Sequence, residues 1–147
     1  MGYDVSVRTT AESPTAVVAQ ATNWEEFPAL WRSLLDEVYG FLRDGGATQR
    51  GHNVMLYRDD VPNVEVGVQV AETFVPSGRV VPSVLPAGHV ATTIHRGSYD
   101  GLDGAHRAIR TWCAAQGHEL TGTRWEIYGD WRDNPEELET EVNYLIR

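Results

Sequence analysis

The sequence predicts an α+β fold built from duplicated strand-strand-helix-strand-strand units. In this fold a curved antiparallel sheet carries two helices on one face and a ligand groove on the other. Three observations predict it. Apolar residues alternate with period two in several short segments, as they do in half-buried strands. Two longer segments have the apolar spacing of amphipathic helices, and the order of these elements repeats once along the 147 residues.

The first half of the sequence contains the elements of one such unit. Strand-like segments at residues 3–9 and 15–23 precede a helix from about Glu26 to Asp44, which carries an apolar stripe and ends at two glycines. Strands at 53–59 and 63–70 follow. They are joined by DDVPN, a sequence of turn-forming residues, and this pair is therefore a predicted hairpin.

The second half repeats this order of elements. Strands at 78–86 and 89–97 are joined by the turn PAG and precede a helix from about Tyr99 to Gln116, which also ends at a glycine. Strands at 123–131 and 139–146 complete the second unit, and the turn-rich segment RDNPEE joins them.

We predict one domain over residues 1–147, with pseudo-repeats at 3–70 and 78–147. The last two strands of the repeats align best, VMLYRDD with WEIYGDW and VEVGVQV with TEVNYLI. Short strands also align by chance, but the shared order of elements favours a duplication, with a groove at the seam between the halves. In this alignment the equivalent pairs are Tyr57 with Tyr128 and Glu65 with Glu141.

Composition argues against two classes of partner. The formal net charge is −9, from 21 acidic and 12 basic residues. Phosphate binding needs a surplus of Lys and Arg on one face, so we expect no nucleic-acid partner, and the acidic balance favours cationic ligands. The sequence has no apolar run of about 18 residues and no recognisable signal peptide. We therefore expect a cytoplasmic protein with no membrane partner.

Cysteine and histidine usage argues against metals and cofactors. The one cysteine, Cys113, lies in an Ala-rich helical segment, so a buried reduced thiol is expected and an internal disulfide is excluded. The five histidines show no ligand spacing. The Gly-rich GSYDGLDG lacks the G-K-[ST] of a phosphate-binding loop. We expect neither a metal nor a cofactor.

Strand alternation also indicates which side chains face away from the predicted core, if four strands share one sheet face. Valines at every second position of 63–70 then take the core face, together with Val54, Leu56, Trp125 and Ile127. Gly67, in mid-strand, marks a bulge or the close approach of a ligand. The opposite face, with tryptophans at its rim, gathers Met55, Tyr57, Glu65, Glu126, Tyr128, Glu141, Trp24, Trp31 and Trp131.

Aromatic rings combined with carboxylates suit a flat, lipophilic, cationic ligand. The rings supply contact area and cation–π attraction of roughly 0.5–2 kcal/mol each, and a partly desolvated carboxylate supplies the counter-charge. The alternative is an ordinary solvated sheet face with polar residues at alternate positions. The matching positions of Tyr57 and Tyr128 in the two halves favour the groove.

The second half of the sequence resembles a known family. The segments are VLPAGHVATTIHRGSYDGLDGAHRAIRTWCAAQG and RWEIYGDWRDNPEELETEVNYLI. As a set they resemble the GyrI-like family, the effector-binding domain that is also fused to AraC-type and MerR-type regulators. The resemblance covers about residues 78–147, and the first half fits by length and element order. Because residues 1–77 are taken up by the first repeat, with no helix-turn-helix, the sequence is similar to the stand-alone members.

The resemblance implies a groove for hydrophobic, often cationic, small molecules, as in multidrug recognition. In the family an acidic residue flanked by aromatics meets the positive charge of the ligand. The matching positions here are Glu126 and Tyr128 in WEIY and Glu141 in TEVNYLI, whereas Tyr57 comes from alternation and the repeat. Some stand-alone relatives hydrolyse cyclopropane-bearing alkylating natural products with a Glu and a Tyr in the same groove.

Two functional hypotheses remain open at this point. The first is a binding protein for lipophilic cationic or aromatic small molecules. The alternative is a hydrolase that opens reactive cyclopropanes, in which Glu141 acts as the base and Tyr128 as the proton donor. A protein partner, such as a topoisomerase, is known within the resemblance, but the sequence contains no recognisable interaction segment. Binding is the primary prediction because no nucleophile–base pair indicates catalysis.

Overall fold

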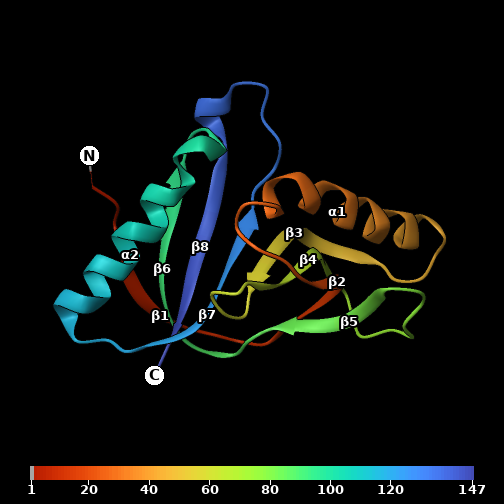
Figure 1. Cartoon of the computed structure of the whole chain (residues 1–147), viewed down its shortest axis with the longest axis horizontal. Helices are drawn as coiled ribbons and strands as arrows, with labels where there is room; N and C mark the ends of the chain where they lie inside the picture. Colours follow the sequence, from red (N-terminus) through yellow and green to blue (C-terminus); the bar gives the residue numbers. More distant parts are fainter. Residues whose placement is uncertain (1) are drawn as a thin grey trace.

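The computed structural model describes residues 2–147, which form one eight-stranded antiparallel sheet and two α-helices (Figure 1). This confirms the predicted α+β class. The first half comprises β1 (Ser6–Thr10), β2 (Ser13–Ala21), α1 (Phe27–Arg43), β3 (Gln49–Tyr57) and β4 (Asn63–Val70). The second half comprises β5 (Val80–Leu85), β6 (Gly88–Arg96), the 3-10 turn η1 (Tyr99–Gly101), α2 (Leu102–Gln116), β7 (Leu120–Tyr128), the 3-10 turn η2 (Pro135–Glu137) and β8 (Glu139–Ile146).

The order of strands in the sheet is β1-β6-β8-β7-β3-β4-β2-β5. The strands β1 to β4 of the first half are equivalent to β5 to β8 of the second half. If each strand is exchanged for its equivalent, the same order is obtained in reverse. At the centre, β3 pairs with β7, and Met55 lies opposite Glu126. Tyr57 and Tyr128 each follow these residues by two positions, so they are related by the same symmetry. The symmetry supports the duplication, which remains a prediction.

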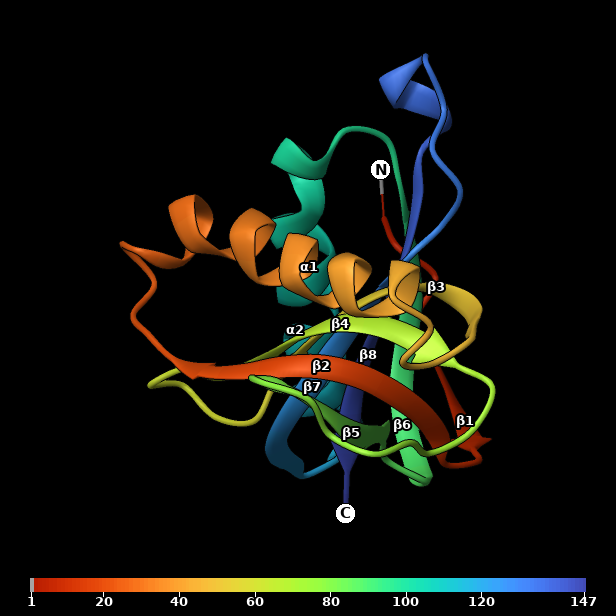
Figure 2. The same cartoon turned by 90° about the vertical axis from the view of Figure 1, so that its right-hand side faces the viewer.

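Both helices pack on the same face of the sheet. α1 covers β2 and β4 through Leu34 and Val38, which pack in one cluster with Met55 and the valines of β4. Figure 2 shows α1 lying across β4 and β2. α2 covers β6 and β8 through Ala105 and Ile109. Gly117 ends α2 in the left-handed conformation that favours glycine, with φ of 78°.

The helix-free face of the sheet is also partly buried. Val54, Leu56 and Trp125, from the central strands, pack there against Leu85 of β5 and Val90 of β6. β5 and β6 are far apart in the strand order, so the sheet curls toward this face to bring them together. The central strands β3 and β7 are therefore buried on both faces, unlike the half-buried strands that simple alternation assumes.

Gly67 lies at a close approach of two strands. It pairs in regular register with Val17 on one side and Val54 on the other, so it is not at a bulge. A Cβ atom at this position would lie 1.8 Å from the backbone oxygen of Ala16. The glycine therefore accommodates the neighbouring β2 backbone, and not a ligand. Within residues 2–147, neither helix is long and apolar enough to cross a membrane.

Candidate functional site

A groove lies between α1 and α2, above the paired strands β3 and β7. In Figure 1 α1 and α2 are set apart, with β7 and β8 in view between them. On the α1 side the groove contains a cavity of about 380 Å³, which we call the aromatic compartment. Its walls include Phe27, Trp31, Tyr57, Tyr99, Tyr128 and Trp131. This groove is thus on the helix-bearing face, whereas the sequence predicts a groove on the opposite face.

Glu126 lies at the floor of this compartment and is only 4% exposed. Its Oε1 accepts hydrogen bonds from the hydroxyls of Tyr57, at 2.9 Å, and Tyr128, at 2.5 Å. Both hydroxyls also lie near the sulfur of Met55, at 3.8 and 3.4 Å. Among residues 2–147, no arginine lines this compartment, and Glu126 is its one carboxylate. A buried carboxylate needs such donors, because losing water without replacement is costly.

The tyrosine hydroxyls remain protonated over a wide pH range. Burial first, and then the neighbouring charge of Glu126, hold the pKa values of Tyr57 and Tyr128 well above the ordinary value of 10.0. Burial also raises the pKa of Tyr99, which packs edge-on against the ring of Tyr128 at 5.5 Å. The groove therefore presents neutral phenols as hydrogen-bond donors beside a carboxylate acceptor.

His106, on α2, completes the hydrogen bonding of Glu126. Its Nε2 lies 2.6 Å from Oε2 of Glu126, and its Nδ1 lies 2.7 Å from the hydroxyl of Tyr144. With the proton on Nε2, a neutral His106 donates to Glu126 and accepts from Tyr144, whose oxygen accepts from Arg110 at 3.0 Å. This chain of hydrogen bonds connects the floor of the groove to the surface of α2.

A second cavity, of about 540 Å³, adjoins the first on the α2 side, and we call it the polar compartment. It shares Tyr57, Tyr99 and Glu126 with the aromatic compartment. Its other walls carry charged or polar groups from α2 and β7, including His106 and Arg110. The two compartments are therefore adjacent parts of one groove, with Glu126 at their boundary.

Glu141 and Glu65 lie on the helix-free face, away from this groove. In the register of β7 and β8, Glu141 pairs with Ile127, and Val142 pairs with Glu126. Adjacent residues of a strand point to opposite faces, so Glu126 and Glu141 are separated by the sheet. Glu65 pairs with Leu56, whose neighbours Met55 and Tyr57 face the helices. The expected common face for these carboxylates and tyrosines does not form.

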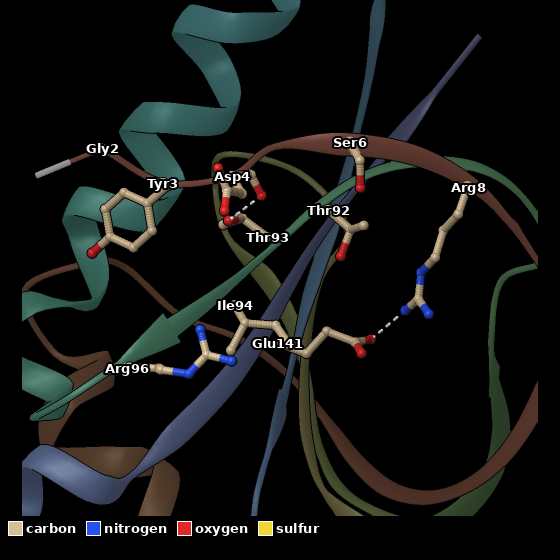
Figure 3. A pocket seen from close by; sticks show the side chains of 10 residues that line it. All are labelled: Gly2, Tyr3, Asp4, Ser6, Arg8, Thr92, Thr93, Ile94, Arg96 and Glu141. Carbon is tan, nitrogen blue, oxygen red and sulfur yellow. Dashed lines mark hydrogen bonds and ion pairs between the residues drawn. The ribbon is translucent and has the colours of Figure 1, made fainter.

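Each of these two carboxylates is already bound within the protein. Arg8 and the side-chain amide of Asn143 donate to Oε2 of Glu141, at 2.6 and 2.8 Å. Figure 3 shows the cleft that Glu141 lines, with Arg8 reaching across from β1. Glu65, similarly, accepts from Ser83, at 2.6 Å, and from Arg58. Glu141 and Tyr128, the predicted base and proton donor, therefore do not face a common substrate.

The three predicted tryptophans lie at or near the groove. Trp31 is half-buried in the wall formed by α1. Trp131, 69% exposed, follows β7 at the rim. Trp24 lines the polar compartment, and its ring packs 5.5 Å from that of Tyr57. Together with Met55, Tyr57, Glu126 and Tyr128, they are the predicted site residues that the fold brings together.

Comparison with known proteins places the chain in a family. A family model described as a GyrI-like small molecule binding domain matches residues 58–146. The chain belongs to the GyrI-like family. No curated protein sequence matches the chain significantly. This confirms the family that the sequence resembles, and small-molecule binding is the function that defines the family's domain.

Solved structures share the GyrI-like fold over the whole chain. The EcmrR C-terminal domain has a TM-score of 0.85 at 21% identity, over 100% of this chain and 99% of that chain. SAV2435, solved with bound tetraphenylphosphonium, has a TM-score of 0.73 at 11% identity, over 100% and 94%. A hydrolase from Listeria innocua has a TM-score of 0.66 at 13% identity, over 99% and 93%. These TM-scores show a common fold, and at such low identities the likeness shows the fold alone.

Several residues of the GyrI-like groove were missed from the sequence. His106 is not spaced from other histidines as metal ligands are. The one feature of the sequence that indicates its position is that it follows Leu102 by one helical turn, on the apolar stripe of α2. Tyr144 lies at an apolar alternate position of the last strand and its ring is buried in the core, but its hydroxyl reaches His106. Tyr99 and Phe27 begin the two helical segments, and tertiary packing alone brings them together. Within residues 2–147, no cluster of side chains suited to a metal ion is present.

Proposed function

We propose that this GyrI-like domain binds lipophilic, aromatic cations in the aromatic compartment, with Glu126 as the counter-charge. One observation carries the proposal: a buried carboxylate lies at the floor of a cavity walled by aromatic rings. The walls bury the apolar surface of the ligand, and the ring faces attract its positive charge. Multidrug-type recognition follows from this chemistry, because neither interaction demands one ligand shape.

The surroundings of Glu126 favour a cation over a neutral ligand. Two of its donors are phenols that remain neutral, and its third hydrogen-bond partner is Nε2 of His106, at 2.6 Å. Hydrogen bonds from neutral donors stabilise the carboxylate and leave its charge in place. Because Glu126 is almost fully buried, its charge acts on a ligand at a lower effective dielectric than a charge in bulk water. SAV2435, a protein of the same fold, has been solved with the lipophilic cation tetraphenylphosphonium, which supports the proposal.

Titration with tetraphenylphosphonium, followed by quenching of tryptophan fluorescence, tests this function. Trp31 lies in the wall of the compartment and Trp131 at its rim, so a ligand there changes their emission. We expect Glu126→Gln to weaken binding at least about tenfold, corresponding to about 1.4 kcal/mol or more. Glu141→Gln is the matched control because it makes the same change of charge on the other face of the sheet. Equal affinity of wild type and Glu126→Gln would overturn the proposed counter-charge.

Hydrolysis of a reactive cyclopropane is a second candidate function. It is favoured by the placement of a carboxylate and two phenol donors around one cavity, and a protein of the same fold is a hydrolase from Listeria innocua. In this reaction Glu126, in place of Glu141, accepts a proton from the water that attacks a ring carbon. Tyr128 or Tyr57 donates a proton to the atom that takes the electron pair of the broken carbon–carbon bond.

Product analysis separates the two functions. The protein is incubated with a cyclopropane-bearing alkylator, and the ring-opened product is quantified by mass spectrometry against a protein-free control. Water adduct that forms with wild type and is lost in Glu126→Gln supports hydrolysis. If tetraphenylphosphonium binds but the water adduct accumulates no faster than without protein, the binding function alone remains.

A further inference from the structure

The polar compartment differs from the aromatic compartment in its charges. Its walls include two guanidinium groups, Arg110 and Arg124, and the carboxylates of Asp103 and Glu126. Glu126 lies at the boundary with the aromatic compartment and is bound by its own donors. A ligand that occupies the aromatic compartment and extends past Tyr57 therefore passes from a carboxylate toward arginines.

Arg124 and Asp103 are already paired with other residues. Arg124, with a side chain 12% exposed, forms an ion pair with Asp60, with Nη1 and Oδ1 2.8 Å apart. Its guanidinium also lies over the rings of Trp24 and Tyr57, 5.6 and 5.8 Å from their centroids. Asp103 accepts from Arg107, one helical turn further along α2, at 3.1 Å. Of the charged side chains that are particular to the polar compartment, Arg110 is thus the one without an ion pair among the described residues.

Arg110 makes one hydrogen bond to a neutral partner. Its Nη1 donates to the hydroxyl oxygen of Tyr144 at 3.0 Å. In the described part of the chain, no carboxylate forms an ion pair with it. A guanidinium has five N–H donors, and their planar arrangement matches a carboxylate or a similar anion. Arg110 therefore retains both charge and donors for a group in the polar compartment.

The groove thus has a negative and a positive end on one helix face. His106, which bonds Glu126, and Arg110 are four residues apart on α2, so they are separated by about 6 Å along the helix axis. We propose that the groove selects dipolar aromatic ligands, with a cationic aromatic body in the aromatic compartment and a carboxylate or sulfonate at Arg110. This inference rests on the proposed binding of aromatic cations and adds the second charge of the ligand.

A matched pair of dyes tests the inference. Rhodamine 123 is a cationic methyl ester, and rhodamine 110 is the same fluorophore with a free carboxylate, so the pair differs at one group. Dissociation constants are measured by fluorescence anisotropy. In Arg110→Met we expect the affinity for rhodamine 110 to fall about fivefold, which is the upper end of the contribution of an exposed ion pair. The affinity for rhodamine 123 should not fall, because the variant removes a positive charge from the path of a cation.

Two further variants control for folding and for net charge. Arg110→Lys keeps the charge but not the planar donors, so it should retain part of the preference for rhodamine 110. Arg43→Met makes the same change of charge at the exposed end of α1, outside both compartments, and should leave the ratio of the two affinities unchanged.

The outcomes distinguish this inference from the function on which it rests. If rhodamine 123 binds and Arg110→Met leaves the ratio unchanged, the selection of dipolar ligands is wrong and the binding of aromatic cations stands. If neither dye nor tetraphenylphosphonium binds, the proposed function is wrong and the inference falls with it. A change in the ratio with Arg110→Met, but not with Arg43→Met, supports the inference.

Discussion

Tyr57 and Tyr128 donate hydrogen bonds to the same carboxylate oxygen, Oε1 of Glu126, although they come from different halves of the chain. The pairing of Met55 with Glu126 at the centre of the sheet makes this possible. Each tyrosine lies two positions beyond that pair, on the same face of its strand. The carboxylate from the second half therefore receives one donor from each half.

The shared oxygen predicts that the two tyrosines are energetically coupled. Tyr57→Phe and Tyr128→Phe should each lower the free energy of unfolding by about 1.5–3 kcal/mol, the typical contribution of a hydrogen bond to a charged group. The double variant should lose more than the sum, because Oε1 then has no donor. Urea denaturation of the four proteins measures the coupling. As a control, Tyr57→Phe combined with Tyr3→Phe should be additive, since Tyr3 bonds His95 elsewhere.

The raised tyrosine pKa values predict a loss of stability at alkaline pH. In the unfolded chain these phenols ionise near the ordinary pKa of 10.0, whereas the folded protein holds them neutral. Their contribution is fully present below about pH 10 and is lost as the pH rises toward the folded-state values. The loss approaches about 1.4 kcal/mol per pH unit for each group. Denaturation curves between pH 8 and 11 should show a shallower decline for the double phenylalanine variant, and an identical slope would contradict the prediction.

His106 should stabilise the fold through Glu126. His106→Leu removes the donor to Oε2 and leaves a buried carboxylate oxygen without that partner, so we expect a cost of about 2–4 kcal/mol. In a Glu126→Gln background the same substitution should cost less, because no buried charge remains. Thermal and urea unfolding measure both differences. His89→Leu is the control, since His89 is exposed and bonds only Thr9 among the described side chains, and its loss should change stability by less than about 0.5 kcal/mol.

The close approach at Gly67 predicts a large effect from a single methyl group. In Gly67→Ala the new Cβ would overlap the backbone oxygen of Ala16, so β2 and β4 must separate. We expect a loss of at least about 3 kcal/mol in the free energy of unfolding. Gly40→Ala, within α1, is the matched substitution, because the atom nearest to its new Cβ would be Nη2 of Arg43, 3.8 Å away. That change should stabilise the protein by about 0.5–1 kcal/mol. A mild effect at Gly67 would show that the two strands tolerate separation.

The sequence predicts the elements of this fold better than it predicts their faces. The turns DDVPN and PAG, the glycines after each helix and the repeated element order are local signals, and they locate the strands and helices to within a few residues. Alternation failed where a strand is buried on both sides. Leu56 and Trp125 look like the core face, and they are buried, but in the cluster on the helix-free side.

This double burial explains the error in the site. With Leu56 and Trp125 assigned to the main core, Tyr57 and Glu126 were predicted to face away from the helices, beside Glu65 and Glu141. The valines of β4 do face the helices, so the faces assigned to β4 were correct. The faces assigned to the neighbouring strand β3 were reversed. Alternation sorts residues within one strand, but the relative phase of two strands depends on register, which a single sequence does not contain. The residues of α2 were missed for a related reason, since the position of a helix over the sheet is a tertiary property.

The pairing of β3 with β7, from Val54–Ile127 to Tyr57–Arg124, runs directly beneath the groove. A ligand bound there contacts α1 and β3 on one side and α2 and β7 on the other. It would therefore hold together the two halves of the sheet, which meet where β3 pairs with β7. Occupancy and the opening of the central sheet are then thermodynamically linked, since opening releases the ligand. Amide hydrogens of β3 and β7 should therefore exchange with solvent more slowly as ligand concentration rises, and those of β1 and β5, at the sheet edges, should not. The extent to which the central strands open would therefore depend on whether a ligand is bound.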